Sequence, residues 1–249
     1  MRLRAVILAL VVVLSGCSHG PVRESPAAPR TGDVTCSDDS VYADPLGPFN
    51  RAVYRFNARF DEAIFLPVSR GYQAVVPAPV RTGINNFFAN LRELTNILNH
   101  ALQGRGRRSA HSLARFMWNT TIGIGGLWDP ATRLGLKRLP TSFGNTLAGW
   151  GVSPGPYLVL PLLGPSNLRD ASGMALGAGV DYTVDLAGVY TSDAALVTGA
   201  VYAVDTRANV DFRYYASGSP FEYDMVRILY TQKRLIESGV LVPPPPPCE

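Results

Sequence analysis

A stretch of apolar residues that glycine and proline repeatedly interrupt, residues 115–170, constrains the fold of this chain more than any other. It reads RFMWNTTIGIGGLWDPATRLGLKRLPTSFGNTLAGWGVSPGPYLVLPLLGPSNLRD, with one acid, Asp129, before its final Asp170. Exposed to water, it would form a large apolar patch, yet its glycines and prolines deny it the helix of about 20 apolar residues that crosses a bilayer. We therefore expect it to lie in short pieces against apolar surroundings.

The first 16 residues have the pattern of an export signal that precedes a lipidated cysteine. Two arginines are followed by an apolar run that is too short to span a bilayer permanently, and then by Leu14-Ser15-Gly16-Cys17. This tetrapeptide resembles a bacterial lipobox, so we predict that Cys17 is acylated and becomes the mature N-terminus. Ser18 follows it in place of the Asp of an inner-membrane retention signal, which favours the outer membrane, facing the periplasm.

Low-complexity segments flank the body of the chain. Residues 17–43 are rich in Ser, Pro, Gly and Asp without periodic apolar positions, which predicts a flexible tether, and residues 240–249 form a proline-rich tail. Cys36 lies in the tether and Cys248 in the tail. An exported protein is in an oxidising compartment, so these two cysteines either form a disulfide or remain two free thiols.

The net charge of the chain argues against nucleic-acid binding, and its low content of charged residues bears on what surrounds it. The formal charge of +4 falls to +2 once a leader with two arginines is removed, which is too little for nucleic-acid binding. Charged residues make up only 17% of the chain, against roughly 25% in soluble domains, which indicates partial contact with lipid or another protein, unless the chain is simply a glycine- and proline-rich globule.

Catalytic chemistry has few candidate residues here. His100 and His111 have no metal-binding spacing, and there is no Gly-x-Ser-x-Gly, phosphate-binding loop or Cys-x-x-Cys. We interpret both histidines as ordinary helix residues. We therefore expect a protein that is not an enzyme and needs no catalytic residue, metal or cofactor.

The periodicity of apolar residues predicts a single, mainly α-helical domain over residues 44–239. Asp44 is expected to cap the first helix and Pro67 to interrupt it, and Thr141 or Ser142 to cap a short helix. Gly173 and Gly177 allow close helix packing. The further predicted elements are helices at 77–103, 109–121, 142–150, from 166 onward, 189–204 and 221–238, with an extended crossing at 155–165.

Two groups of side chains have two interpretations each. An apolar stripe on the first helix faces either the core, which we prefer, or lipid; it consists of Phe49, Val53, Phe56, Phe60 and Ile64. Trp118 and Trp128 flank a glycine break and lie either at a water–lipid interface or in the core.

Asparagine is unusually frequent in the second predicted helix. These residues are Asn85, Asn86, Asn90, Asn96 and Asn99. Because asparagine is a poor helix former, five of them suggest either hydrogen bonds between helices or a polar lining that faces water.

Four motifs carry a family resemblance. DPL-x-x-FNR begins at Asp44, and RF-x-x-NT-x-x-G-x-GG, FG-x-TL-x-x-x-GV and GPY-x-x-LP-x-x-G-x-x-x-LRD follow within residues 115–170. Together they resemble the signature of the MlaA (VacJ) lipoproteins, which help to keep phospholipid out of the outer leaflet of the Gram-negative outer membrane. The long tether, Cys36, Cys248 and the proline run are not marks of that family.

The resemblance implies a ring- or disc-like helical body that lies partly in the inner leaflet and encloses a central lipid path. Misplaced phospholipid would move along it toward a periplasmic carrier of the MlaC kind, with trimeric porins as partners. A mobile hairpin would lie near the mouth of the path, with the candidate residues Leu134, Leu136, Lys137, Arg138 and Phe143.

Two alternative functions are considered beside lipid transport. One is a scaffold lipoprotein that binds porins without moving lipid, and the other is a periplasmic lipid hydrolase.

Overall fold

The computed structural model describes residues 44–185, 195–216 and 218–238. Contacts divide the chain into two units, and all described residues belong to the unit formed by residues 39–246. The predicted export signal (1–16), the tether (17–43), the tail (240–249), Cys17, Cys36 and Cys248 lie outside the described residues.

The described residues are mainly helical, as predicted. In chain order the elements are α2 (Gly47–Phe60), the π-helical turn η1 (Asp61–Phe65), α3 (Leu66–Val75), α4 (Ala78–Leu102), α5 (Gly106–Thr121), α6 (Pro130–Arg133), α7 (Phe143–Gly149), β1 (Tyr157–Leu160), β2 (Gly164–Asn167), α8 (Leu168–Val184), α9 (Ala195–Ala208) and α10 (Glu222–Ser238). None of these helices combines the length and the hydrophobicity that a membrane crossing requires.

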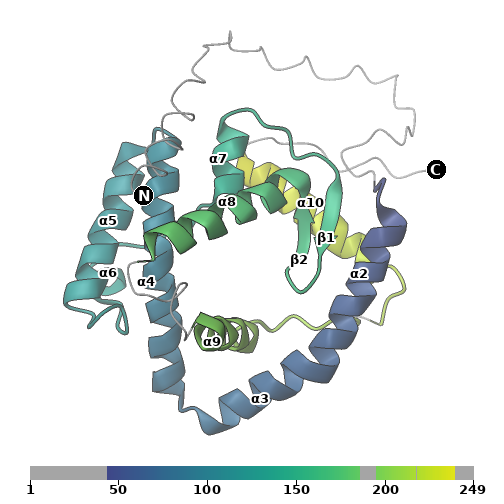
Figure 1. The fold of residues 1–249 in the computed structure, drawn as a ribbon, viewed down its shortest axis with the longest axis horizontal. Coiled ribbons are helices and arrows are strands. Elements are labelled where there is room, and N and C mark those ends of the chain that lie inside the picture. The colour runs from purple at the N-terminus through teal and green to yellow at the C-terminus, as the bar shows by residue number, and fades with distance from the viewer. Residues whose placement is uncertain (1–43, 186–194, 217, 239–249) are drawn as a thin grey trace. The chain divides into compact units, whose positions relative to one another are not determined.

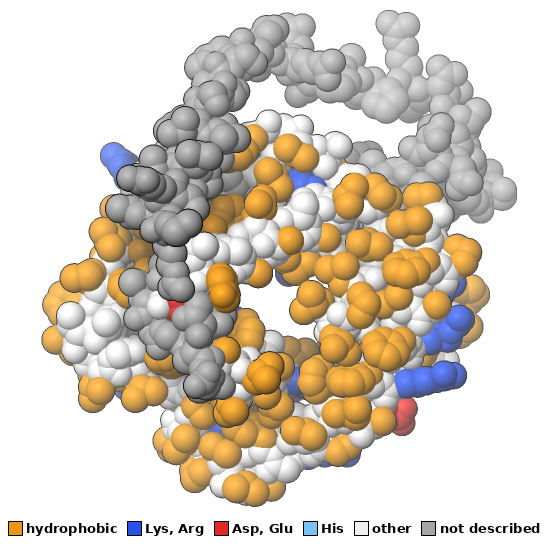
Figure 2. Space-filling model, in the orientation of Figure 1, with side chains coloured by type: hydrophobic (Ala, Val, Ile, Leu, Met, Phe, Trp, Pro, Cys, Tyr) orange, Lys and Arg blue, Asp and Glu red, His pale blue; other side chains and the backbone are white. Residues whose placement is uncertain are grey.

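Contacts and chain connections link these elements in a circuit (Figure 1). Helix α2 touches β1, which pairs with β2, and both strands touch α8. Helix α8 touches α4, which connects back to α2 through α3 and η1, while α9 packs on α3 and α4. Figure 2 shows an opening inside this circuit, between the β-hairpin, α8 and α9.

Most predicted helices are confirmed, because their periodicity and caps are local signals. The Ser142 hydroxyl accepts a hydrogen bond from the Asn145 amide at 3.3 Å and caps α7, as predicted. Close packing at Gly173 is also confirmed, since a side chain there would meet the backbone of Gly144 at 2.4 Å. The predicted helix over 189–204 corresponds to α9, with residues 189–194 outside the described residues.

The start of the first helix differs from the prediction. Leu46 is the residue before α2, and it makes no side-chain cap. The carboxylate of Asp44 instead accepts hydrogen bonds from the side chains of Asn50, at 2.7 Å, and Tyr223. Asp44 therefore joins α2 to α10 and does not cap the helix.

Pro67 does not interrupt the first helix. Proline lacks an N–H and its ring clashes with the carbonyl four residues earlier. The preceding turn is the wider π-helix, in which the Leu66 amide donates to the carbonyl of Asp61, so the chain continues into α3. The prediction of a break was wrong because a π-turn has no recognisable sequence signal here.

The extended stretch at 155–165 is confirmed as extended chain, but it forms a hairpin and not a crossing. Strands β1 and β2 are antiparallel, with Tyr157 opposite Asn167 and Leu160 opposite Gly164. Helix α2 covers the outer edge of β1 with two side-chain amides: Asn50 pairs with the Tyr157 carbonyl and the Val159 amide, and Asn57 with the Leu160 carbonyl and the Leu162 amide, at 2.8–3.0 Å. These bonds satisfy backbone groups that an uncovered strand edge would leave open.

The interior contains two different kinds of packing. Tyr54, Tyr157, Val159 and Tyr223 form a hydrophobic cluster where α2, β1 and α10 meet. Elsewhere the helices bury polar residues, and those of α2, α4 and α5 are Asn50, Asn57, Asn90, Glu93, Asn96, Asn99, His100, Ser112, Arg115 and Asn119.

The preference for core packing of the apolar stripe on the first helix holds for Val53, which packs against the hydrophobic cluster, while Phe60 is half-buried and the other three residues contradict it. Phe49, Phe56 and Ile64 are about half exposed, whereas the polar Asn50, Asn57 and Asp61 point inward. The physical reason is that each inward polar group finds a partner: the two amides bind β1, and the Asp61 carboxylate pairs with Arg207.

Candidate functional site

Apolar side chains cover the outside of several helices whose polar side chains are buried. Those that are at least 43% exposed on α2, η1, α3, α5 and the segment after α5 are Phe49, Phe56, Ile64, Val68, Val75, Leu113, Met117, Trp118, Ile122, Ile124, Leu127 and Trp128. Figure 2 shows hydrophobic side chains spread over the visible face and around the opening. The exposed side of α2 also carries Arg51, Arg55 and Arg59, so these surfaces combine apolar side chains with positive charges and fit partly apolar surroundings.

Trp118 and Trp128 are both 43% exposed, which favours the interfacial interpretation over a fully buried one, and Trp150 is 50% exposed. The Trp150 indole N–H donates to the Leu102 carbonyl at 3.2 Å. The Arg133 guanidinium lies 4.9 Å from the centre of the Trp128 ring. Each of these two rings thus has an apolar body on the surface and a polar group beside it, as at a boundary between lipid and water.

An ionic cluster, the Arg115 cluster, joins α4, α5 and α6. The Arg115 side chain is 1% exposed, and its Nε donates to Glu93 Oε1 at 2.8 Å while its Nη2 donates to Asp129 Oδ2 at 3.1 Å. Its Nη1 donates to the Thr132 hydroxyl and to the carbonyl of Leu136. Burial alone would raise the pKa of Asp129, but hydrogen bonds from Thr132 and the arginines outweigh it and hold this pKa well below its ordinary value.

The predicted hairpin residues from 134 to 138 lie at or next to this cluster. Leu134 is exposed, Leu136 offers its carbonyl to Arg115, and the Lys137 carbonyl lies 2.8 Å from His111 Nε2. Arg138 binds Asp129 at 3.1 Å and the side-chain oxygen of Asn86 at 2.9 Å. The fifth residue, Phe143, begins α7.

Side chains of α4 and α5 thus fix the backbone of residues 136–139. His100 Nε2 also lies 3.0 Å from the Leu139 carbonyl. Sequence reasoning missed the roles of Glu93, Arg115 and both histidines at this segment, although one acid within a long apolar helix was an available signal. A role of the five candidate residues in gating stays a prediction.

All five asparagines of α4 bond to residues outside α4. Asn90 donates to the Thr120 hydroxyl, Asn96 accepts from the Thr141 amide, and Asn99 accepts from the Thr146 hydroxyl, at 2.6–3.0 Å. Asn86 donates to the Leu127 carbonyl at 3.3 Å and Asn85 to Asp205 at 3.4 Å. These contacts favour the first interpretation, hydrogen bonds between elements; a lining role for the asparagines stays a prediction.

The opening in Figure 2 is bordered by the turn between β1 and β2. This turn carries two exposed leucines, Leu162 and Leu163. In the described part of the chain, no three His, Cys, Asp or Glu side chains gather as metal ligands would.

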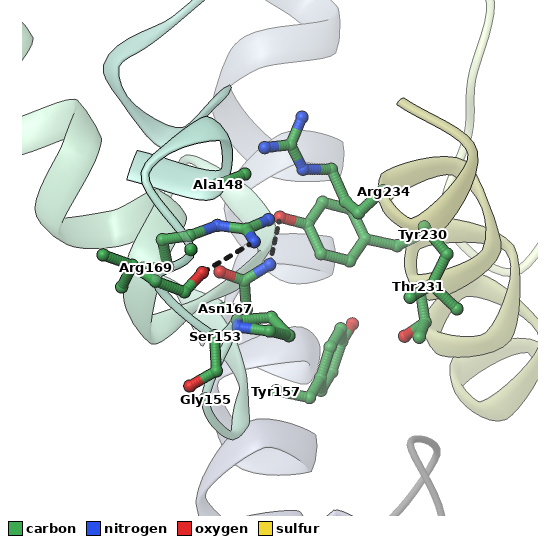
Figure 3. A pocket seen from close by; sticks show the side chains of 13 residues that line it. Ala148, Ser153, Gly155, Tyr157, Asn167, Arg169, Tyr230, Thr231 and Arg234 are labelled. Atoms are coloured by element: carbon green, nitrogen blue, oxygen red, sulfur yellow. Dashed lines mark hydrogen bonds between the residues drawn. The ribbon is translucent and has the colours of Figure 1, made fainter. Parts of the chain in front are cut away.

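A separate cavity of about 380 Å³ lies between the loop before β1, the hairpin, the start of α8, and α10 (Figure 3). Its polar lining includes Tyr157, Asn167, Arg169, Tyr230 and Arg234. Sequence reasoning did not predict it, because its walls come from segments about 80 residues apart.

Comparison with known proteins gives a consistent result. A family model described as MlaA lipoprotein matches residues 42–237. The chain is 36% identical over 178 residues to the intermembrane phospholipid transport system lipoprotein MlaA of Escherichia coli (strain K12), covering 70% of this chain and 65% of that protein. It is 29% identical over 215 residues to the protein of that name in Haemophilus influenzae, covering 84% of this chain and 79% of that protein.

Two further matches extend the comparison. An uncharacterized protein of Rickettsia prowazekii (strain Madrid E) is 42% identical over 127 residues, so the chain spans about half the length of that relative. A solved structure described as "Structural basis for maintenance of bacterial outer membrane lipid asymmetry" has 33% identity and a TM-score of 0.66, covering 78% of this chain and 98% of that chain.

Proposed function

Because the chain belongs to the MlaA lipoprotein family, we propose that it is an outer-membrane lipoprotein that maintains lipid asymmetry. It removes misplaced phospholipid from the outer leaflet and passes it toward the periplasm for retrograde transport. It does so without catalysis, by offering the lipid a path.

The observation that carries this proposal is that α2 and α5 expose apolar side chains while they bury polar ones. A protein surrounded by lipid gains little from burying apolar side chains, but every polar group must find a partner inside. Phe56 and Met117 are about half exposed on helices that bury Asn57 and Arg115. In water the exposed apolar groups would cost free energy; in the apolar part of one leaflet they are solvated.

The opening between the hairpin, α8 and α9 (Figure 2) supports a route through the body. A phospholipid has a charged headgroup and apolar chains, and an unshielded charge in hydrocarbon costs several kcal/mol. A passage through a protein that lies in the leaflet removes that cost. The candidate path residues of the 134–143 segment and the asparagines of α4 belong to this proposal.

The partners and the anchor are also part of the proposal. Acylation of Cys17 holds the protein at the periplasmic face of the outer membrane. A trimeric porin provides a docking surface within the membrane, and a soluble carrier of the MlaC kind receives the lipid.

The test is to delete the gene and measure phospholipid in the outer leaflet. We expect phospholipid to accumulate there and wild-type protein to remove it. Leu163→Trp enlarges a side chain that is 70% exposed at the hairpin turn and should obstruct the opening, so it should fail to rescue; Val75→Trp, at the exposed end of α3, is the matched control and should rescue.

The outcomes separate the alternatives. Full rescue by Leu163→Trp, with a photo-crosslinker at position 163 that captures no phospholipid, favours the scaffold that binds porins without moving lipid. Release of fatty acid by purified protein would instead favour a hydrolase. Absence of phospholipid accumulation in the deletion strain would overturn the proposal.

A further inference from the structure

The turn between α4 and α5 forms a strongly basic surface that has no role in the proposed lipid path. Its residues are Gly104-Arg105-Gly106-Arg107-Arg108, and all five are exposed. A Cβ atom added to Gly104 or Gly106 would meet no packed neighbour within 4 Å, so the turn is open on its outer side. Figure 2 shows a positively charged side chain projecting at the upper left, where this turn lies in Figure 1. We call the three arginines of this segment the basic turn.

The basic turn has no counter-charge beside it in the described part of the chain. None of the three arginine side chains makes a hydrogen bond or an ion pair with a described residue. Asp and Glu are absent from residues 94–128 and 130–169, which include the end of α4, the whole of α5, and α7. Three positive charges therefore lie together without a carboxylate near them in the sequence.

The carboxylates on neighbouring elements do not balance these charges. Those of the Arg115 cluster are paired within that cluster. On α8, Asp170 is committed to Arg234 at 2.6 Å, and Asp181 accepts a hydrogen bond from Thr95 at 2.8 Å. Thr95 lies nine residues before the turn, which is about 13 Å along α4. Counting these groups leaves the positive excess at the turn in place.

The arginines do not stabilise the helix on which they lie. Helix α5 begins at Gly106, without a side-chain cap and without an acid in its first turn. Because the helix dipole places partial positive charge at this end, Arg107 and Arg108 are unfavourable there, and they also repel each other. The stability of α5 therefore does not explain this arrangement, whereas negative charge held against the turn would relieve it.

Apolar side chains are exposed on both sides of the basic turn. Trp150, at the end of α7, is 50% exposed, and its indole N–H donates to the carbonyl of Leu102, two residues before the turn, at 3.2 Å. On α5, Leu113 and Met117 are about half exposed. A half-exposed indole beside arginines is typical of the headgroup level of a bilayer, where rings meet hydrocarbon and positive charges meet phosphate. The polar surface of an acidic protein would leave these apolar side chains without cover.

We propose that the basic turn binds the phosphates of anionic phospholipids at the membrane surface, with Trp150 beside it among the headgroups. Arginine suits this role, because its planar guanidinium donates several hydrogen bonds to phosphate oxygens. The turn thereby gives the protein a preference for anionic over zwitterionic lipid. This inference rests on the proposed function only in placing the body of the protein at a membrane.

Binding to two kinds of vesicle tests the inference. The purified full chain is diluted from a non-ionic detergent into vesicles of phosphatidylcholine, or of equal parts phosphatidylcholine and phosphatidylglycerol, and bound protein is measured after flotation. The ratio of the two partition coefficients cancels the contribution of any acyl chains at Cys17, which insert alike into both. An arginine at an anionic surface contributes about fivefold in affinity, so replacing all three arginines of the turn by Gln should lower the ratio about a hundredfold. High salt should lower the wild-type ratio, because it screens exposed charges.

The matched control removes three other exposed arginines and so changes the net charge equally. Arg55, Arg59 and Arg70 also have no described partner, but Asp61 and Glu62 lie between them in the chain and offset their charge. Replacing these three by Gln should leave most of the preference for phosphatidylglycerol. Both triple variants should keep the wild-type Tm in detergent, because no replaced side chain has a hydrogen bond or ion pair with a described residue.

The outcomes decide the inference. A low ratio for the basic-turn variant, with a ratio near that of the wild type for the control, supports it. Equal losses in both variants would show that the preference follows net charge alone and would overturn it. An unchanged ratio in the basic-turn variant would also overturn it and leave an acidic protein as the occupant. The proposed function fails separately: outer-leaflet phospholipid in the deletion strain tests transport, whereas the vesicle ratio tests only headgroup preference.

Discussion

The Arg115 cluster and the tyrosine cluster lie in one unit of the chain but are stabilised by different forces. Around Arg115, helices α4, α5 and α6 meet through charges and hydrogen bonds, while Leu113, Met117 and Trp118 of α5 point outward. Where α2, β1 and α10 meet, Tyr54, Tyr157, Val159 and Tyr223 pack as in the core of a water-soluble protein.

The difference indicates which surroundings each region has. Apolar burial stabilises a protein only when the alternative for the apolar group is water. The tyrosine cluster is stabilised by that driving force, which indicates that its apolar groups would be exposed to water if this region unfolded. The Arg115 cluster does not use it, since its apolar side chains remain outside and its specificity comes from paired polar groups.

The largest expected effect is from Arg115→Met. It leaves the Glu93 carboxylate buried without its positively charged partner, while Asp129 keeps Arg138, and removal of one member of a buried ion pair costs about 3–5 kcal/mol. The Tm of the purified protein in detergent should fall sharply. The exposed neighbour Leu113→Ala is the control on the same helix and should change the Tm little.

The double variant Glu93→Leu with Arg115→Met sharpens this test. Replacing both charges by apolar groups removes the unpaired carboxylate of Glu93, and Arg138 still binds Asp129. It should therefore be more stable than Arg115→Met alone. A double variant that is less stable than the single one would mean that the charges do not act as a pair.

An intermediate effect is expected from Val159→Ala in the tyrosine cluster. Val159 is fully buried, and loss of two methyl groups there should cost about 2 kcal/mol. The check is a chemical denaturation curve with and without detergent. If detergent abolished this loss of unfolding free energy, water would not be the alternative environment of the cluster, and the contrast between the two regions would be wrong.

Sequence patterns predicted the helices well because caps and periodicity are local. Ser142 caps a helix as predicted, and α10 begins one residue after the predicted 221. Sequence patterns did not predict which face of a helix is buried, because an apolar stripe that includes Phe49 and Phe56 has the same spacing whether it faces a core or lipid. The partners of Arg115 lie 22 and 14 residues away and follow no pattern, so the cluster required the fold.

The smallest effect on stability is expected from Phe56→Ser. Phe56 is 50% exposed on α2, next to no buried apolar cluster, so its loss should change the free energy of unfolding in detergent by no more than about 0.5 kcal/mol. Its affinity for phospholipid vesicles should nevertheless fall, because an aromatic ring that lipid covers contributes through burial there. Tyr54→Ser, two residues away on the inner face, provides the opposite control: it removes a ring of the core and the bond to Glu222 at 2.8 Å, and should destabilise the protein in detergent. If Phe56→Ser destabilised the protein as strongly as Tyr54→Ser, α2 would have a core on both faces, and the contrast between its exposed apolar and buried polar side chains, on which the proposed function depends, would be wrong.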